Sequence, residues 1–127
     1  GGLVMKICVT ASSADSLVAD MRFARSKNLA IYDDAKDTME FVENQGFTSN
    51  HGAGIAASHQ VVKLGIDVVI TGNVGPNAYE ILEDADVKMY KLQDKDINNA
   101  IKGYKEGKLE EIVNAAPKHF GMGKQNG

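Results

Sequence analysis

Residues 51–90 read HGAGIAASHQVVKLGIDVVITGNVGPNAYEILEDADVKMY, and this stretch indicates the fold class of the chain. Residues 52–64 have apolar side chains partly at helical spacing, and Gly65 follows them as a natural C-terminal stop. A second helix is expected to begin at Pro76, since proline suits the first position of a helix. Each helix leads into a predicted strand, at 67–71 and 87–91. Alternation of helices and strands is typical of βα units with a parallel sheet.

Both predicted helices follow a glycine-rich junction, at residues 51–54 and 71–77. Glycine allows close approach of a backbone or a ligand, and a helix start offers unpaired N–H groups with partial positive charge. The junctions are not nucleotide fingerprints, because the third glycine of GxGxxG is replaced by Ala57 and no GxxxxGK[ST] occurs. We therefore expect an anionic ligand that is not recognised through a nucleotide fingerprint. It would lie near four glycines: Gly52, Gly54, Gly72 and Gly75.

Upstream of this stretch the sequence predicts three more strands. Residues 6–10 (KICVT) are typical of a buried strand, and residues 28–32 (NLAIY) of a second one. Residues 38–44 (TMEFVEN) alternate between apolar and polar side chains, as an antiparallel strand does. The charged turn at 33–37 would join the second and third strands into a hairpin.

The predicted fold class is α/β, with a single domain, a mixed five-stranded sheet and flanking helices. The last helix is expected at 96–103, followed by a further turn at 109–113. We assign residues 5–114 to the domain and residues 115–127 to a flexible C-terminal tail, since the tail is rich in Gly, Lys and Asn. Residues 1–4, before Met5, are interpreted as a remnant of cloning.

The carboxyl ends of parallel strands define where a ligand is expected to bind. In open α/β sheets, ligands lie in the crevice beyond those ends. The loop after Thr10, the Gly72 loop and the residues after Tyr90 are predicted to meet at this edge. Whether the His51 loop joins them depends on the topology.

Composition excludes several classes of protein. The 127 residues are 43% hydrophobic and 24% charged, which is ordinary for a soluble globular domain. No apolar run approaches the ~20 residues that span a membrane, and residues 5–10 are too short for a signal peptide. The net charge of −3 without a Lys/Arg cluster argues against nucleic acid as the main partner. We therefore expect a cytoplasmic protein that binds neither nucleic acid nor membrane.

The chain has a single cysteine, Cys8, in the middle of the first predicted strand. One cysteine forms no internal disulfide, and it excludes an iron–sulfur or zinc site built from several cysteines of one chain. Free cysteine is often a small buried hydrophobic residue. We expect Cys8 to be buried rather than to ligate a metal.

Three segments together resemble one known family. The first is VADMRFAR at 18–25, with AIYD at 30–33; the others are HGAGIA at 51–56 and GIDVVITGNVGPNA at 65–78. In this order they resemble the dinitrogenase iron–molybdenum cofactor biosynthesis family, which includes NifX-like proteins, the NifB C-terminal domain and the orange protein. The resemblance covers about residues 5–109, and the sequence departs from it at Ala24, where the family usually has glycine.

The resemblance implies a ribonuclease H-like motif without nuclease activity. It also implies a non-catalytic binding or carrier protein for an anionic metal–sulfur cluster. The cargo would be the iron–molybdenum cofactor, its precursor or a related molybdenum-containing cluster, and a cluster-synthesis or acceptor protein would be the partner. The sequence indicates neither the cargo nor the oligomeric state.

Candidate ligand-binding residues lie in the three matching segments. Arg22 and Arg25 would share a face if their turn is helical, and two guanidinium groups could then hold a polyanion. His51 precedes a helix start, where its imidazole could ligate metal or pair with an anion. Asn73 lies in the second glycine-rich junction and either binds the cargo or shapes the turn. The full candidate set is Arg22, Arg25, His51, Gly52, Gly54, Gly72, Asn73 and Gly75, with His51 as the metal ligand.

Other polar residues are assigned structural or solvated roles. His59 lies inside the first predicted helix and is expected to be structural or exposed. His119 lies in the tail and would reach a site only if the tail folds back. The acidic residues of the hairpin turn are expected to be solvated, because the spacing and terminal Glu of an EF-hand are absent.

Two alternative functions stay open. A small regulatory domain could bind a phosphate-containing ligand through the same loops. A metal-dependent hydrolase on a ribonuclease H-like fold would need converging carboxylates. Asp15, Asp20 and Asp67 are the candidates, but their spacing matches no known arrangement and the first strand has no acidic residue.

Overall fold

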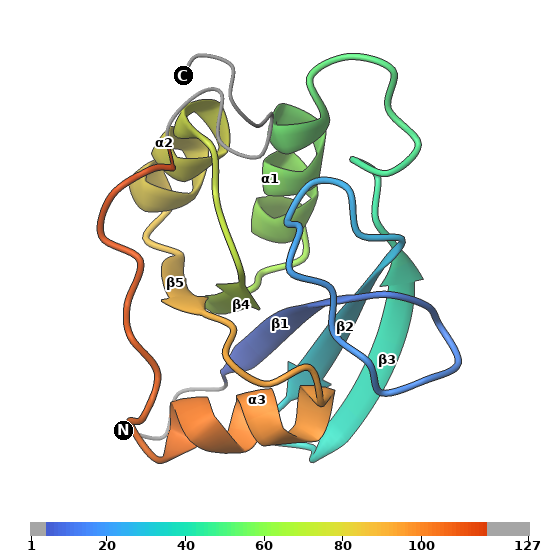
Figure 1. Cartoon of the computed structure of the whole chain (residues 1–127), viewed down its shortest axis with the longest axis vertical. Coiled ribbons are helices and arrows are strands. Elements are labelled where there is room, and N and C mark those ends of the chain that lie inside the picture. The colour runs from blue at the N-terminus through green and yellow to red at the C-terminus, as the bar shows by residue number, and fades with distance from the viewer. Residues whose placement is uncertain (1–4, 117–127) are drawn as a thin grey trace.

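A computed structural model describes residues 5–116 of the chain as one mixed five-stranded sheet with three helices (Figure 1). The order of the strands across the sheet is β3-β2-β1-β4-β5. This confirms the predicted α/β class with a mixed five-stranded sheet, whereas the ribonuclease H-like label stays a prediction. The strands are β1 (Lys6–Ala11), β2 (Asn28–Asp33), β3 (Thr38–Glu43), β4 (Val68–Thr71) and β5 (Lys88–Lys91).

The two halves of the sheet differ in strand direction. β1, β2 and β3 pair antiparallel, while β1 with β4 and β4 with β5 pair parallel. The β2–β3 hairpin closes at the Asp33–Thr38 pair, and the Asp33 carboxylate accepts hydrogen bonds from the amides of Ala35 and Lys36. The charged connection is therefore an Asx-type turn, as its composition indicates.

Each helix begins or ends at a residue with a clear local cause. The helices are α1 (Ala53–Lys63), α2 (Pro76–Asp84) and α3 (Ile97–Lys105). After α1, Gly65 has a φ of 72°, and two hydrogen bonds, Gly65 N to Val62 O and Ile66 N to Val61 O, form a Schellman motif. α2 starts with proline at its first position. At α3, the Asp96 carboxylate accepts a hydrogen bond from the amide of Asn99.

The sheet separates two hydrophobic clusters. Cys8, Ile31 and Val69 face α1 and α2, whereas their neighbours Val9 and Val68 face α3. Figure 1 shows the same arrangement, with α1 and α2 on one face of the sheet and α3 on the other. This alternation follows from the two-residue period of a strand.

Cys8 is fully buried, as predicted, and burial raises the pKa of its thiol to about 12. A thiol in this state is a poor nucleophile and metal ligand.

One local expectation differs from the structure, and another lies mostly outside the described residues. The turn expected at 109–113 is wrong: Glu111 pairs antiparallel with Tyr90, because this segment runs along the free edge of β5. The tail prediction and His119 fall almost wholly outside the described residues. At the start of the tail, the amide of Ala116 donates to the carbonyl of Val74.

Among residues 5–116, no helix combines the length and the apolar character needed to cross a bilayer.

Candidate functional site

Three loops meet at the carboxyl edge of β1, β4 and β5. The amide of Ala19 donates to Lys95 O, and the amide of Leu92 donates to Thr71 O. Arg22 forms a parallel bridge with Asn73. The predicted meeting of the loops after Thr10, around Gly72 and after Tyr90 is therefore confirmed. A depression of about 410 Å³ lies beside them, lined by Ser12, Val18, Ala19, Asp20, Met21, Arg22 and Lys95.

The N-termini of α1 and α2 lie side by side near this edge. A Cβ placed on Gly54, in the first turn of α1, would lie 3.5 Å from the Cβ of Ala78, in the first turn of α2. Neither helix has a capping side chain or an acidic residue in its first turn. The amides of residues 53–55 and 77–78 precede the first helical hydrogen bonds. Two partial positive charges therefore lie close together without a carboxylate of their own.

The candidate glycine positions differ in whether packing or backbone conformation requires glycine. Gly72 is buried, and a Cβ there would overlap the carbonyl oxygen and side chain of Met21. Gly52 adopts the left-handed conformation, with a φ of 63°. Gly75 has an ordinary φ of −71° and open space around it. Gly72 is thus required by packing and Gly52 by the backbone, whereas Gly75 leaves the start of α2 uncovered.

Arg22 forms a two-pronged ion pair with Asp20. Its Nε donates to Asp20 Oδ1 at 3.0 Å, and its Nη2 donates to Asp20 Oδ2 at 2.8 Å. The side chain of Arg22 is 66% exposed, while that of Asp20 is only 12% exposed. The Arg22 hydrogen bonds lower the pKa of the Asp20 carboxyl, and the charge of Lys95 contributes a smaller lowering. Among residues 5–116, no group accepts a hydrogen bond from Nη1 of Arg22, so both N–H donors of this atom are available.

Arg25 connects the loop of Arg22 to the segment before α1. Its Nη1 donates to Ser49 O at 3.0 Å and to Gly46 O at 3.4 Å. These acceptors are neutral carbonyls, and no carboxylate of residues 5–116 forms an ion pair with Arg25. The conditional expectation that Arg22 and Arg25 share a helical face is wrong, because residues 21–25 form no helix. Long-range contacts instead hold Arg22 beside Asn73 and Arg25 beside Ser49.

The remaining candidate side chains are exposed. His51 lies directly before the left-handed Gly52, and Asn73 projects from the loop after β4. His59 is exposed on α1, which agrees with the structural or solvated role expected for it. The structure thus brings the His51 loop to the N-termini of α1 and α2, the point that the sequence left open.

The candidate hydrolytic carboxylates do not converge. Asp20 is paired with Arg22 at the carboxyl edge. Asp67 precedes β4 at the opposite edge, where it accepts a hydrogen bond from the amide of Lys6. Asp15 accepts a hydrogen bond from Ser13 in an exposed loop. Within residues 5–116, no group of three His, Cys, Asp or Glu side chains is placed to hold a metal ion.

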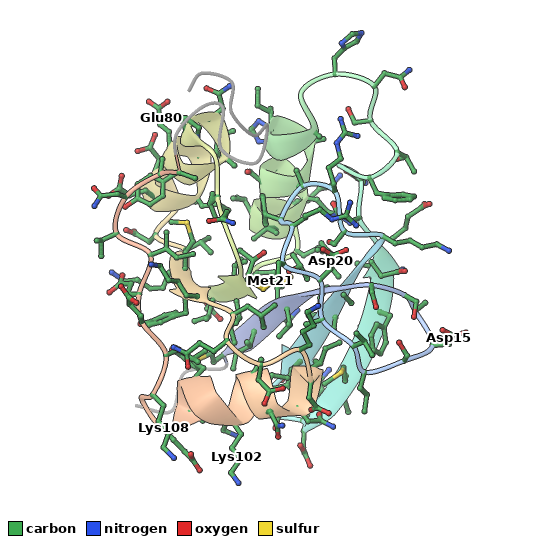
Figure 2. The ribbon with its side chains drawn as sticks, in the orientation of Figure 1. Asp15, Asp20, Met21, Glu80, Lys102 and Lys108 are labelled. Carbon is green, nitrogen blue, oxygen red and sulfur yellow. The ribbon has the colours of Figure 1, made fainter. Side chains whose placement is uncertain are left out.

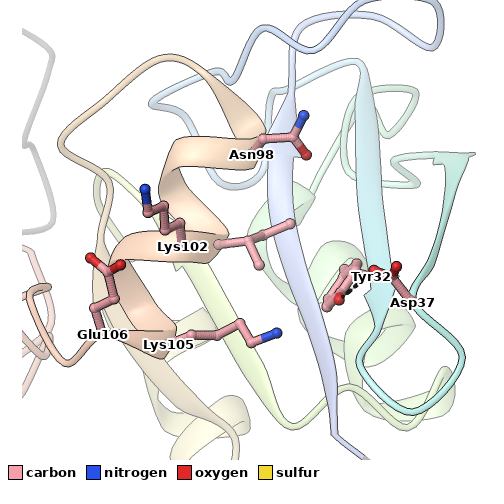
Figure 3. Close-up of a pocket in the computed structure, with 7 residues that line it drawn as sticks. Tyr32, Asp37, Asn98, Lys102, Lys105 and Glu106 are labelled. Atoms are coloured by element: carbon pink, nitrogen blue, oxygen red, sulfur yellow. Dashed lines mark hydrogen bonds between the residues drawn. The ribbon is translucent and has the colours of Figure 1, made fainter.

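A second recess of about 380 Å³ lies between α3 and the β2–β3 hairpin (Figure 3). There the Tyr32 hydroxyl donates to the Asp37 carboxylate at 2.8 Å. Lys105 donates to Asp34 at 2.8 Å, and its ammonium lies 5.4 Å from the centre of the Tyr32 ring. Lys105 is thus paired with a carboxylate, Lys102 is an exposed cation, and the recess lies on the α3 side of the sheet. It is therefore a control surface rather than the candidate site.

Sequence reasoning missed several residues that shape the site. Asp20 was considered only as a hydrolytic carboxylate, not as the partner of Arg22. Gly46 is buried against the carbonyls of Ala24 and Ala53, which joins the first and second matching segments. The buried hydroxyls of Thr10 and Thr71 were also missed. Polar residues at the ends of two neighbouring parallel strands were the signal that could have revealed the threonines.

Comparison with known proteins identifies the family. Residues 5–107 match the family described as dinitrogenase iron-molybdenum cofactor, and the chain belongs to that family. The family assignment agrees with the resemblance carried by the three segments. It associates the chain with a function related to the iron–molybdenum cofactor.

Solved structures support the same assignment. The apo form of the orange protein from Desulfovibrio gigas is 30% identical, with a TM-score of 0.81 over 91% of this chain and 99% of that one. A Thermotoga protein described as NifB is 32% identical, with a TM-score of 0.77 over 88% of this chain and 97% of that one. One sequence relative, an uncharacterised Methanocaldococcus jannaschii protein, is 32% identical over 73 residues. This match spans 58% of this chain and 62% of that protein.

Proposed function

We propose that the chain is a non-catalytic binding or carrier protein for an anionic metal–sulfur cluster. The cargo class is the iron–molybdenum cofactor, its precursor or a related molybdenum-containing cluster. The proposed site consists of Arg22, Arg25, His51, Gly52, Gly54, Gly72, Asn73 and Gly75. The partner in this proposal is a cluster-synthesis or acceptor protein.

One observation carries the proposal: the adjacent and uncapped N-termini of α1 and α2. Helix N-termini attract anions through their free amides and the helix dipole. The contact between Gly54 and Ala78 places two such ends beside each other. α3, on the other face, instead has the Asp96 carboxylate as its cap, so it lacks this affinity.

The two arginines supply the remaining positive charge. Among the described residues Arg25 is bound to carbonyls and to no carboxylate, so it retains a full charge at the edge of the site. Arg22 is neutralised by Asp20, but its Nη1 donors have no acceptor within the described part of the chain. In this proposal His51, directly before α1, supplies an imidazole that ligates a metal of the cluster.

A phosphate-binding regulatory domain is the alternative that these features favour next. Phosphate uses the same amides and guanidinium groups as a cluster. Ligand size and softness distinguish the two, since sulfur-rich clusters spread their charge over a larger surface. The hydrolase alternative has less support, because its candidate carboxylates lie apart.

The test is an anaerobic calorimetric titration with tetrathiomolybdate, run in parallel with molybdate and inorganic phosphate. Charge-assisted hydrogen bonds contribute ~1.5–3 kcal/mol each. Arg22→Ala and Arg25→Ala should therefore weaken binding of tetrathiomolybdate about tenfold or more, because ~1.4 kcal/mol corresponds to one factor of ten. His51→Ala should do the same if the imidazole ligates metal.

Controls separate binding from folding. Lys102→Ala removes an exposed cation from the α3 recess, and His59→Ala removes an exposed imidazole from α1; both should leave the affinity unchanged. Arg25→Lys keeps the positive charge but removes the guanidinium that donates to the carbonyls of Gly46 and Ser49. Unchanged affinity in the three site variants, or tighter binding of phosphate than of tetrathiomolybdate by the wild type, would contradict the proposal.

A further inference from the structure

Two buried threonines lie at the carboxyl ends of neighbouring parallel strands, beneath the candidate site. Thr10 in β1 and Thr71 in β4 are fully buried, and their Oγ1 atoms lie 2.9 Å apart. Both hydroxyls point to the segment that carries Arg22. Thr10 Oγ1 donates to the carbonyl of Asp20 at 2.6 Å, and Thr71 Oγ1 lies 3.5 Å from the carbonyl of Met21.

The hydroxyl protons have only one consistent arrangement around Thr10. Each threonine hydroxyl donates one proton and accepts through two lone pairs. Since Thr10 donates to Asp20 O, its oxygen accepts from Thr71 across the 2.9 Å contact. Thr71 therefore stabilises the orientation of Thr10, and its proton also lies within reach of Met21 O. We call this pair of hydroxyls the threonine latch.

Backbone hydrogen bonds also fix the segment of Asp20 and Met21. The amide of Asp20 donates to Thr10 O at 2.8 Å, and the amide of Gly72 donates to Met21 O at 2.9 Å. Figure 2 shows Met21 beside the end of β4, with Asp20 next to it. Arg22 follows immediately and forms the bridge with Asn73. Hydrogen bonds from the carboxyl ends of β1 and β4 thus fix the position of the segment that carries Arg22.

We propose that Thr10 and Thr71 are positioning residues of the anion site, holding Arg22 in register with the N-termini of α1 and α2. This inference rests on the proposed function. The threonines touch no ligand in this account and act only through the Asp20–Arg22 segment. A core role alone would need no hydroxyl, because valine fills the same volume in a strand.

The test compares Thr71→Val, which removes the hydroxyl at similar volume, with Thr71→Ser, which keeps it. Amide hydrogen exchange should rise about tenfold or more at Asp20 and Gly72 in Thr71→Val, because the segment opens more often. Thr71→Ser should stay within about threefold of the wild type. Thr38→Val, an exposed threonine at the start of β3, is the matched control and should change neither amide.

A double-mutant cycle separates positioning from general stability. Thr71→Val should weaken tetrathiomolybdate binding about tenfold in the wild type and should have no further effect in Arg22→Ala, since it acts through that side chain. A purely structural threonine would give additive losses. If Thr71→Val does not fold, Thr10→Val provides the same comparison.

The outcomes distinguish the two proposals. Unchanged exchange in Thr71→Val, equal behaviour of the serine and valine variants, or additive losses with Arg22→Ala would each overturn the positioning role. If the wild type binds no tetrathiomolybdate, the proposed function fails, and the exchange data alone decide whether the latch holds the segment.

Discussion

At the scale of single residues, Asp20 links the candidate site to acid stability. The hydrogen bonds from Arg22 lower the pKa of the Asp20 carboxyl below its ordinary value of 3.8. A carboxyl with a lowered folded-state pKa stabilises the protein above the unfolded-state pKa, and this contribution is lost as the pH falls through the folded value. The effect is modest because Arg22 is largely exposed to solvent.

We therefore expect Asp20→Asn to reduce the loss of thermal stability on acidification. The melting temperature of the wild type should fall further than that of the variant between neutral pH and a pH below 3.8, whereas above pH 5 the two curves should run parallel. Thermal melts across this range, followed by circular dichroism, provide the measurement. Asp15→Asn, at an exposed loop carboxylate, is the control. Parallel curves for Asp20→Asn and wild type throughout would show that the ion pair contributes nothing to stability.

At the scale of elements, the loop after β4 explains why two glycines of one motif differ in importance. A methyl group on Gly72 would overlap the backbone of Met21, whereas one on Gly75 meets open space. Gly72→Ala should therefore cost about 1–3 kcal/mol, as overpacked sites do. Gly75→Ala should stay within roughly 0.5–1 kcal/mol, because alanine is only a poorer N-cap. Urea unfolding of both variants checks this, and equal losses would contradict the packing around Met21.

The helices and strands were largely predictable because local signals mark them. Gly65 and Pro76 end and begin helices through their own backbone preferences, and the alternation of residues 38–44 marks an edge strand. The segment at 109–113 was mispredicted because its pairing with Tyr90 is a long-range contact. The same reason applies to residues 21–25, whose conformation is set by Asn73, Ser49 and the threonine latch rather than by helix propensity.

At the scale of the whole molecule, the topology explains what sequence reasoning could and could not reach. The chain order predicted a mixed sheet and the edge at which loops would meet. It could not place the His51 loop, because that depends on α1 lying beside α2 on one face of the sheet. Arg22 and Arg25 were selected from the resemblance to the family, while their actual partners, Asp20 and Ser49, became visible only in the folded chain.

The central claim is that the N-termini of α1 and α2 and the two arginines bind one anionic cargo. The most direct test is an anaerobic ¹⁵N NMR titration of the full chain with tetrathiomolybdate. We expect the largest shifts at the amides of residues 53–55 and 77–78 and at the Nε signals of Arg22 and Arg25, all saturating together as a single site. Shifts centred on Lys102 and Lys105 in the α3 recess, or separate saturation of the two helix N-termini, would contradict the account.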